Sequence, residues 1–160
     1  MIKLKSSANH QNFTLYIEHL KLSLRLNDTF DKNQIDEASD VLLQKAIETS
    51  DLRLIKICLK LRIKIVTNYL KEEEKAVKIF RDYNKVLRPH NKVNVHWVSL
   101  ILYFYYNWSG EIYCSENPEQ VKADLKVCKE FIYKRSNSKD WSELIEAWYK
   151  AKKVFLTVNE

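Results

Sequence analysis

Apolar residues recur every three or four positions along most of the chain, with polar residues between them. That period is typical of amphipathic α-helices, which bury one face. Where the pattern stops, capping residues, a proline or the single glycine mark the ends of seven predicted helices. They lie near residues 10–26, 33–49, 51–70, 72–88, 93–108, 118–135 and 139–157. The pattern therefore predicts an all-α fold.

One segment, residues 57–65, also fits a strand, because ICLKLRIKI alternates apolar residues with others. The basic residues around it favour a helix. They recur at intervals of three, four and four, which forms one stripe on a helix but would scatter over both faces of a strand. These residues are Arg53, Lys56, Lys60 and Lys64.

The stretch HWVSLILYFYYNW, residues 96–108, has ten apolar or aromatic residues in thirteen positions. It is far shorter than the ~20 apolar residues that a membrane-spanning helix needs. Trp97, Leu100, Ile101 and Phe104 follow helical spacing, and further apolar residues cover much of the remaining circumference. We therefore expect a central helix that packs on several sides.

Composition narrows the function classes. One glycine cannot supply the Gly-rich loops that cradle nucleotide phosphates. The three cysteines, Cys58, Cys114 and Cys128, contain no C-x-x-C pair and predict reduced thiols rather than disulfides or a zinc site. No apolar signal segment follows the N-terminal MIKLK, so we expect an intracellular, cytoplasmic protein, with the nucleus as the alternative. No cofactor and no metal are predicted.

An internal repeat is visible in four of the predicted helices. Each has large apolar residues at i, i+3, i+4 and i+7, starting at residues 13, 54, 97 and 141, which are 41, 43 and 44 residues apart. Near-constant spacing, with one helix between successive copies, favours repeated helical hairpins. The alternative is a plain helical bundle.

Two of these copies, WVSLILYF (97–104) and WSELIEAW (141–148), are similar to the W-x2-L-G-x2-Y opening of a tetratricopeptide repeat (TPR). Ala76 and Phe80, followed by Pro89, resemble the A-x3-F ending of such a repeat, with the proline one residue late. The resemblance implies a stack of antiparallel helical hairpins whose inner face binds peptides or proteins.

The chain departs from the TPR pattern in three ways. Ile101 and Ile145 stand where the family has Gly, Tyr83 stands where a small residue is usual, and the repeat is longer than 34 residues. A large residue at the Gly position is expected to push paired helices apart. Because of these departures, the prediction is TPR-like rather than a strict TPR. The resemblance implies a right-handed superhelix in one α-helical repeat domain, residues 1–160. Its predicted parts are hairpins at about 10–49, 51–88 and 93–135 and a terminal helix at 139–157.

Positive charge is concentrated in the second predicted hairpin. Residues 51–92 hold 12 Lys and Arg against 5 Asp and Glu, a net charge of +7, whereas the rest of the chain has a net charge of −1. One side of the predicted helix 72–88 and its flanks forms a basic patch: Lys71, Lys75, Lys78, Arg81, Lys85, Arg88 and Lys92. Such a patch suits an acidic protein segment, a nucleic-acid backbone or an anionic membrane surface, or is simply a solvated face.

A polar stripe interrupts the apolar helix 93–108. It consists of His96, Ser99, Tyr103 and Tyr106, next to Lys92. In a hairpin stack this stripe would line the concave surface, where phenols provide both apolar area and hydrogen bonds to a partner. The alternative is that the two tyrosines merely reach the surface from the core.

Local catalytic motifs are absent from the sequence: the four histidines form no H-x-x-x-H or H-E-x-x-H arrangement, and G-x-S-x-G needs two glycines. The sequence therefore predicts no enzyme and no catalytic residue. It predicts a scaffold, adaptor or complex subunit that binds a protein partner, for which an acidic segment would be complementary. The alternative is a nucleic-acid-associated subunit that uses residues 51–92.

Overall fold

The computed structural model describes residues 2–26, 31–135 and 141–159. The chain forms two compact units, Met1–Glu72 and Glu73–Glu160. Every regular element in the described residues is a helix, which confirms the prediction of an all-α chain. The boundary between the units lies inside the predicted hairpin 51–88, so that its two helices belong to different units. The single repeat domain stays a prediction.

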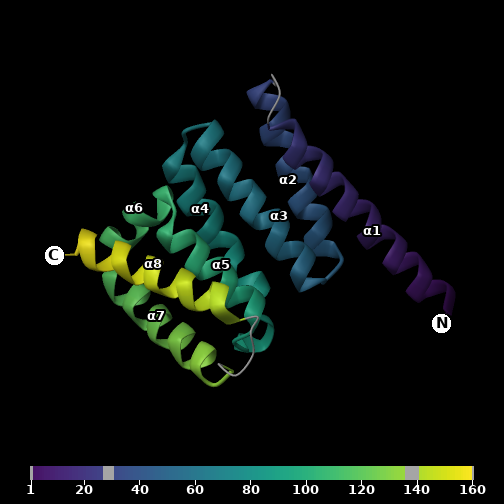
Figure 1. Cartoon of the computed structure of the whole chain (residues 1–160). Coiled ribbons are helices and arrows are strands. Elements are labelled where there is room, and N and C mark those ends of the chain that lie inside the picture. The colour runs from purple at the N-terminus through teal and green to yellow at the C-terminus, as the bar shows by residue number, and fades with distance from the viewer. Residues whose placement is uncertain (1, 27–30, 136–140, 160) are drawn as a thin grey trace. The chain divides into compact units, whose positions relative to one another are not determined.

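In the first unit, three α-helices pack on one another (Figure 1): α1 (Ile2–Arg25), α2 (Lys32–Glu48) and α3 (Leu52–Lys64). A π-helical turn, Ile65–Tyr69, continues α3. α1 begins earlier than the predicted start near residue 10, whereas α2 and α3 begin within two residues of their predicted positions.

Aspartate side chains fix the starts of α2 and α3. Asp31 Oδ1 accepts a hydrogen bond from the N–H of Asn33 at 2.8 Å, and Asp51 Oδ1 accepts one from the N–H of Leu54 at 3.2 Å. Such N-caps satisfy main-chain donors that have no partner inside the helix, and each typically contributes about 1 kcal/mol. The short connections between the helices then make their neighbours antiparallel.

Polar contacts also join the helices of this unit. The buried guanidinium of Arg62, on α3, forms an ion pair with the carboxylate of Asp36 on α2 and donates to Ser39 Oγ at 3.0 Å. His19 Nε2, on α1, donates to the main-chain oxygen of Ile57 at 3.2 Å. A buried cation needs such partners, so Arg62 holds α3 in register with α2.

The segment 57–65 lies in α3 and the first residue of the π-helical turn, so the helical prediction is confirmed and the strand alternative is wrong. Its alternation has a packing cause. α3 contacts both α1 and α2, and residues on more than one of its sides are therefore buried, including Cys58, Leu59, Leu61 and Ile63.

The second unit is built around α5 (Figure 1). Its described helices are α4 (Glu73–Tyr83), α5 (Val95–Tyr106), α6 (Trp108–Glu116), α7 (Pro118–Tyr133) and α8 (Ser142–Val158), with 3-10 turns at Asn84–Leu87 and Pro89–Asn91. α5 packs against α6, α7 and α8, and α8 also packs against α6 and α7. The prediction of a central helix at 93–108 is thus confirmed.

An aromatic cluster holds this unit together. The Phe80 and Phe104 rings stack with centroids 3.9 Å apart, and Tyr105 and Tyr113 stack at 5.8 Å. Edge contacts connect the two stacks, with the Tyr113 ring 5.3 Å from that of Phe80. Phe80, Phe104 and Tyr105 are at most 1% exposed, so that α4, α5 and α6 share one core.

The helix α6 was not predicted, because Gly110 was interpreted as a break after helix 93–108. Gly110 instead lies inside α6, where that helix passes close to the end of α5. A Cβ atom at this position would lie 2.0 Å from the main-chain oxygen of Phe104. Glycine is therefore required for close approach rather than for ending a helix.

The hairpin predicted at about 93–135 also differs from the expectation. Because α6 follows α5 directly, α5 and α7 are not the consecutive pair expected for 93–135. Asn117 precedes α7 as expected, yet its side chain does not cap that helix. Its Nδ2 donates instead to the main-chain oxygen of Tyr113 at 3.2 Å, at the end of α6.

Candidate functional site

The helix α1 carries apolar residues on two opposite faces. On one side, Leu15 and Leu22 are buried in the first unit, as is Leu26 directly after the helix. On the other side, four large apolar side chains face solvent, and we call them the outer face of α1: Phe13 (63% exposed), Ile17 (37%), Leu20 (57%) and Leu24 (59%). Their spacing of four, three and four residues forms a narrow stripe of the kind that packs against a second helix in coiled coils.

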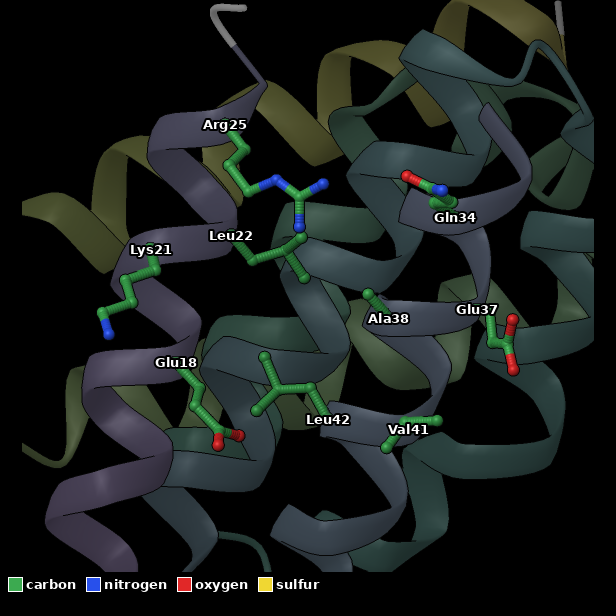
Figure 2. A pocket seen from close by; sticks show the side chains of 9 residues that line it. All are labelled: Glu18, Lys21, Leu22, Arg25, Gln34, Glu37, Ala38, Val41 and Leu42. Carbon is green, nitrogen blue, oxygen red and sulfur yellow. The ribbon is translucent and has the colours of Figure 1, made fainter. Parts of the chain in front are cut away.

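A groove lies between α1 and α2 in the same unit (Figure 2). Its volume is about 550 Å³. Leu22 from α1 and Leu42 from α2 point into it, with Ala38 beside them. Charged side chains of both signs surround this apolar floor: Glu18, Lys21 and Arg25 on the α1 side and Glu37 on α2. The first unit therefore presents a groove with an apolar floor and a charged rim close to its exposed apolar surface.

The polar stripe predicted to contact a partner lies on α5, and all four of its residues are half-buried: His96, Ser99, Tyr103 and Tyr106. The Tyr103 and Tyr106 rings meet edge to face with centroids 5.8 Å apart. Lys150 of α8 lies over the Tyr106 ring, 5.7 Å from its centroid. Burial raises the pKa of both phenols. One tyrosine of the stripe thus packs against α8, and the role of the stripe in binding stays a prediction.

The basic patch does not form one continuous helical stripe. Lys71 belongs to the first unit and precedes α4, and only Lys75, Lys78 and Arg81 lie on α4 itself. Lys85 lies in the following 3-10 turn, and Arg88 and Lys92 flank the turn Pro89–Asn91. The helix predicted over 72–88 ends early, at Tyr83, and the chain then changes direction.

Three members of the patch converge on a pocket of about 320 Å³ in the second unit, which we call the α4–α7 pocket. Arg81, Lys85 and Arg88 line it from α4 and the following turn, and Gln120 and Asp124 line it from α7. Its apolar wall consists of Phe80, Trp97, Ile101 and Tyr113. The guanidinium of Arg88 lies over the Trp97 ring, 4.6 Å from its centroid, and is thereby held in place.

Asp124 is a buried carboxyl in the wall of this pocket. Tyr105 donates its hydroxyl hydrogen to Asp124 Oδ2 at 2.5 Å, and Gln120 Nε2 donates to Oδ1 at 3.0 Å. Burial raises the pKa of Asp124, and the two hydrogen bonds and the nearby charge of Arg88 oppose that rise in part. Burial likewise raises the pKa of Tyr105, together with the charge of Asp124.

Asp124 and Gln120 cannot be recognised as site residues from the local sequence. On α7 they are four residues apart and so lie on one face, but nothing in the local pattern places that face near the basic residues. The spacing of Trp97 and Phe80 predicts only core or repeat positions. The pocket depends on α4, α5 and α7 coming together, which no local motif encodes.

The three cysteines are buried. Burial raises the pKa of Cys58 and of Cys114 to about 12 and raises that of Cys128 as well, so their thiolates are disfavoured at neutral pH. Among the described residues, no three His, Cys, Asp or Glu side chains gather as they would around a metal ion.

Comparisons with protein-family models, with curated proteins and with solved structures find no match to this chain. None of the helices in the described ranges is long and apolar enough to cross a membrane. The sites above are therefore interpreted from their own chemistry.

Proposed function

We propose that this chain is a non-enzymatic adaptor or complex subunit that binds an amphipathic helix of a protein partner on the outer face of α1. One observation carries the proposal: four large apolar side chains at coiled-coil spacing are exposed on one side of a helix whose opposite side is already buried. Large contiguous apolar patches on a surface are typical of interaction sites.

The partner's chemistry follows from this surface. A stripe spaced four, three and four residues apart interlocks best with another helix that has the same spacing. Lys21 and Arg25 lie on α1 beside the groove, and the whole chain has a net charge of +6. A partner helix flanked by Asp and Glu would be attracted to a chain of net positive charge, whereas a second copy of the chain would bring like net charges together.

Two finer parts of the proposal come from the sequence. The consecutive helical pairs α1–α2 and α2–α3 are compatible with the TPR-like stack that the resemblance implies, and we extend the proposal to that arrangement and to a cytoplasmic adaptor. A second surface for the same partner is the half-buried stripe on α5, where Tyr103 and Tyr106 would act as anchors.

Site-specific cross-linking in the full-length chain tests the proposal. A photoreactive residue replaces Leu20 on the outer face or, as a matched control, Leu156, which is 51% exposed on α8. Cells of the native source are irradiated, and the cross-linked peptides are sequenced by mass spectrometry. We expect position 20, and not position 156, to capture one defined peptide that has apolar residues at i, i+3, i+4 and i+7 with acidic flanks.

Substitutions on the outer face then test whether the cross-linked partner depends on this surface. Leu20→Ser with Leu24→Ser should remove the partner from affinity purifications, whereas Leu156→Ser should retain it. A cross-link from position 20 to a second copy of this chain would contradict the proposed occupant. Partners that disappear on nuclease treatment and on Lys75→Glu with Lys78→Glu would instead favour the nucleic-acid alternative.

A further inference from the structure

The α4–α7 pocket differs in chemistry from the outer face of α1. Its three cations come from α4 and the turn that follows, and the hydrogen-bonded pair Gln120 and Asp124 comes from α7. Among the described residues, no hydrogen bond or ion pair engages the side chain of Arg81 or Lys85. The pocket therefore combines a cationic wall with a wall that accepts hydrogen bonds.

Strained backbone forms part of this pocket. His90 and Asn91 both have a φ of 57°, the left-handed region that residues other than glycine rarely adopt. Asn91 lines the pocket, and its main-chain oxygen accepts a hydrogen bond from Arg88 Nε at 3.2 Å. The turn thus holds Arg88 against Trp97 in the wall of the pocket. Such strain costs about 1–3 kcal/mol per residue and is concentrated at binding sites.

We propose that the α4–α7 pocket binds a phosphate monoester that also carries hydroxyl groups. Three cations match a doubly charged phosphate better than a single carboxylate, because each can give a charge-assisted hydrogen bond. The carboxyl of Asp124 would repel a second acidic group but accepts hydrogen bonds from hydroxyls. A run of acidic peptide side chains therefore fits the pocket less well than a small phosphorylated polyol.

The size of the pocket agrees with this ligand. A volume of about 320 Å³ is at the lower end of the range for small-molecule sites. The apolar wall, with Trp97 and Tyr113, would cover the carbon skeleton of the ligand on one side. The charged groups of the ligand then face Arg81 and Lys85, and its hydroxyls face α7.

Calorimetric titration of the full-length chain tests the proposal, with glycerol 3-phosphate and inorganic phosphate as the probes at constant ionic strength. We expect both to bind, and glycerol 3-phosphate to bind more tightly because its hydroxyls reach Asp124. Arg81→Gln and Lys85→Gln should each weaken binding about tenfold, the value of one charge-assisted hydrogen bond. Lys78→Gln is the matched control, since Lys78 is exposed on α4 but does not line the pocket.

Asp124→Asn distinguishes the contribution of α7 to binding from that of the three cations. This variant should bind inorganic phosphate as the native chain does, or more tightly, and should lose the preference for glycerol 3-phosphate. Absence of binding by the native chain, or equal weakening by Lys85→Gln and Lys78→Gln, would overturn the proposal. Thermal unfolding of each variant shows that its fold is intact.

A phosphate monoester that carries hydroxyl groups occurs both as a free metabolite and as the headgroup of phosphatidylinositol 4-phosphate. Sedimentation with phosphatidylcholine vesicles that contain phosphatidylinositol 4-phosphate separates these sources. Cosedimentation that Lys85→Gln abolishes assigns the pocket to a lipid headgroup. Binding of glycerol 3-phosphate without cosedimentation assigns it to a free metabolite.

Discussion

The helices α1 and α5 both carry large apolar residues at i, i+3, i+4 and i+7, but they bury different shares of them. In α5 these residues are Trp97, Leu100, Ile101 and Phe104, and none is more than 3% exposed. In α1 the equivalent positions are Phe13, Tyr16, Ile17 and Leu20, and all of them are exposed or half-buried. The same pattern thus marks a core in one helix and a surface in the other.

This difference in burial follows from the number of helices that pack against α5 and α1. α5 is surrounded by α6, α7 and α8, which leaves almost no face without a partner. Within its unit, α1 packs against α2 and α3, and these two helices cover the side with Leu15 and Leu22. Because α2 and α3 both cover the same side of α1, one of its two apolar stripes is buried and the other stays exposed.

The largest expected effect comes from Phe104→Ala in α5. This change removes the ring that stacks on Phe80 and leaves a cavity in a fully buried cluster. We expect the free energy of unfolding to fall by about 3–5 kcal/mol. Denaturation by urea, followed by circular dichroism, measures the loss. A loss below about 1 kcal/mol would mean that α5 is not the centre of the second unit.

Gly110→Ala tests the close approach of α6 to the end of α5. The added Cβ would lie 2.0 Å from the Phe104 oxygen and 2.6 Å from the Tyr105 oxygen, so one helix must shift. We expect a destabilisation of about 1–3 kcal/mol, although alanine usually stabilises a helix relative to glycine. Ala123→Gly, on the exposed side of α7, is the control for helix propensity alone. A gain in stability on Gly110→Ala would contradict the described position of α6.

This glycine also shows how far the sequence was informative. Helical periodicity and capping residues predicted the all-α class and most helix positions, because both are local properties. The α6 helix escaped prediction because a glycine inside a helix looks the same in sequence as a glycine between helices. Only the distance to the Phe104 oxygen, a tertiary contact, distinguishes them.

The α4–α7 pocket could not be predicted from the sequence for a similar reason. The basic residues were visible as a charge stripe, but their convergence with Gln120 and Asp124 depends on the turn at Pro89–Asn91 and on the packing of α7. The apolar spacing on α1 is visible in the sequence too, but there it predicts a repeat rather than an exposed stripe. Sequence spacing shows which residues share a face and does not show which face another helix covers.

The hydrogen bond between Tyr105 on α5 and Asp124 on α7 predicts that the stability of the fold depends on pH. The pKa of Asp124 is raised in the folded chain, so the native state binds a proton more readily there than the unfolded state does. Stability from this group is therefore present at low pH and is lost as pH rises above the ordinary Asp value of about 3.9 and through the raised pKa. Because Tyr105 donates to the carboxylate, it limits this loss.

Tyr105→Phe should consequently cost more at pH 7 than at pH 4. We expect a loss of about 1–3 kcal/mol at pH 7, the usual effect of removing one partner of a buried polar group. Urea denaturation at both pH values measures the difference. In an Asp124→Asn background the cost of Tyr105→Phe should no longer depend on pH, and an unchanged dependence would point to another titrating group.

The smallest effect is expected for Leu20→Ala on the outer face of α1. Leu22→Ala, two residues away on the buried side, is the comparison. Leu20 is 57% exposed on the outer face, whereas Leu22 is 5% exposed on the buried side. Leu22→Ala should cost about 2–5 kcal/mol, and Leu20→Ala should change the free energy of unfolding by less than about 0.5 kcal/mol, because no packing is lost. Thermal and urea unfolding of the isolated chain at two protein concentrations measure both.

If Leu20→Ala were as costly as Leu22→Ala and the cost rose with concentration, a second copy would already cover the outer face. An equal cost that is independent of concentration would mean that another part of the chain covers it, and the surface would then not be available to a partner.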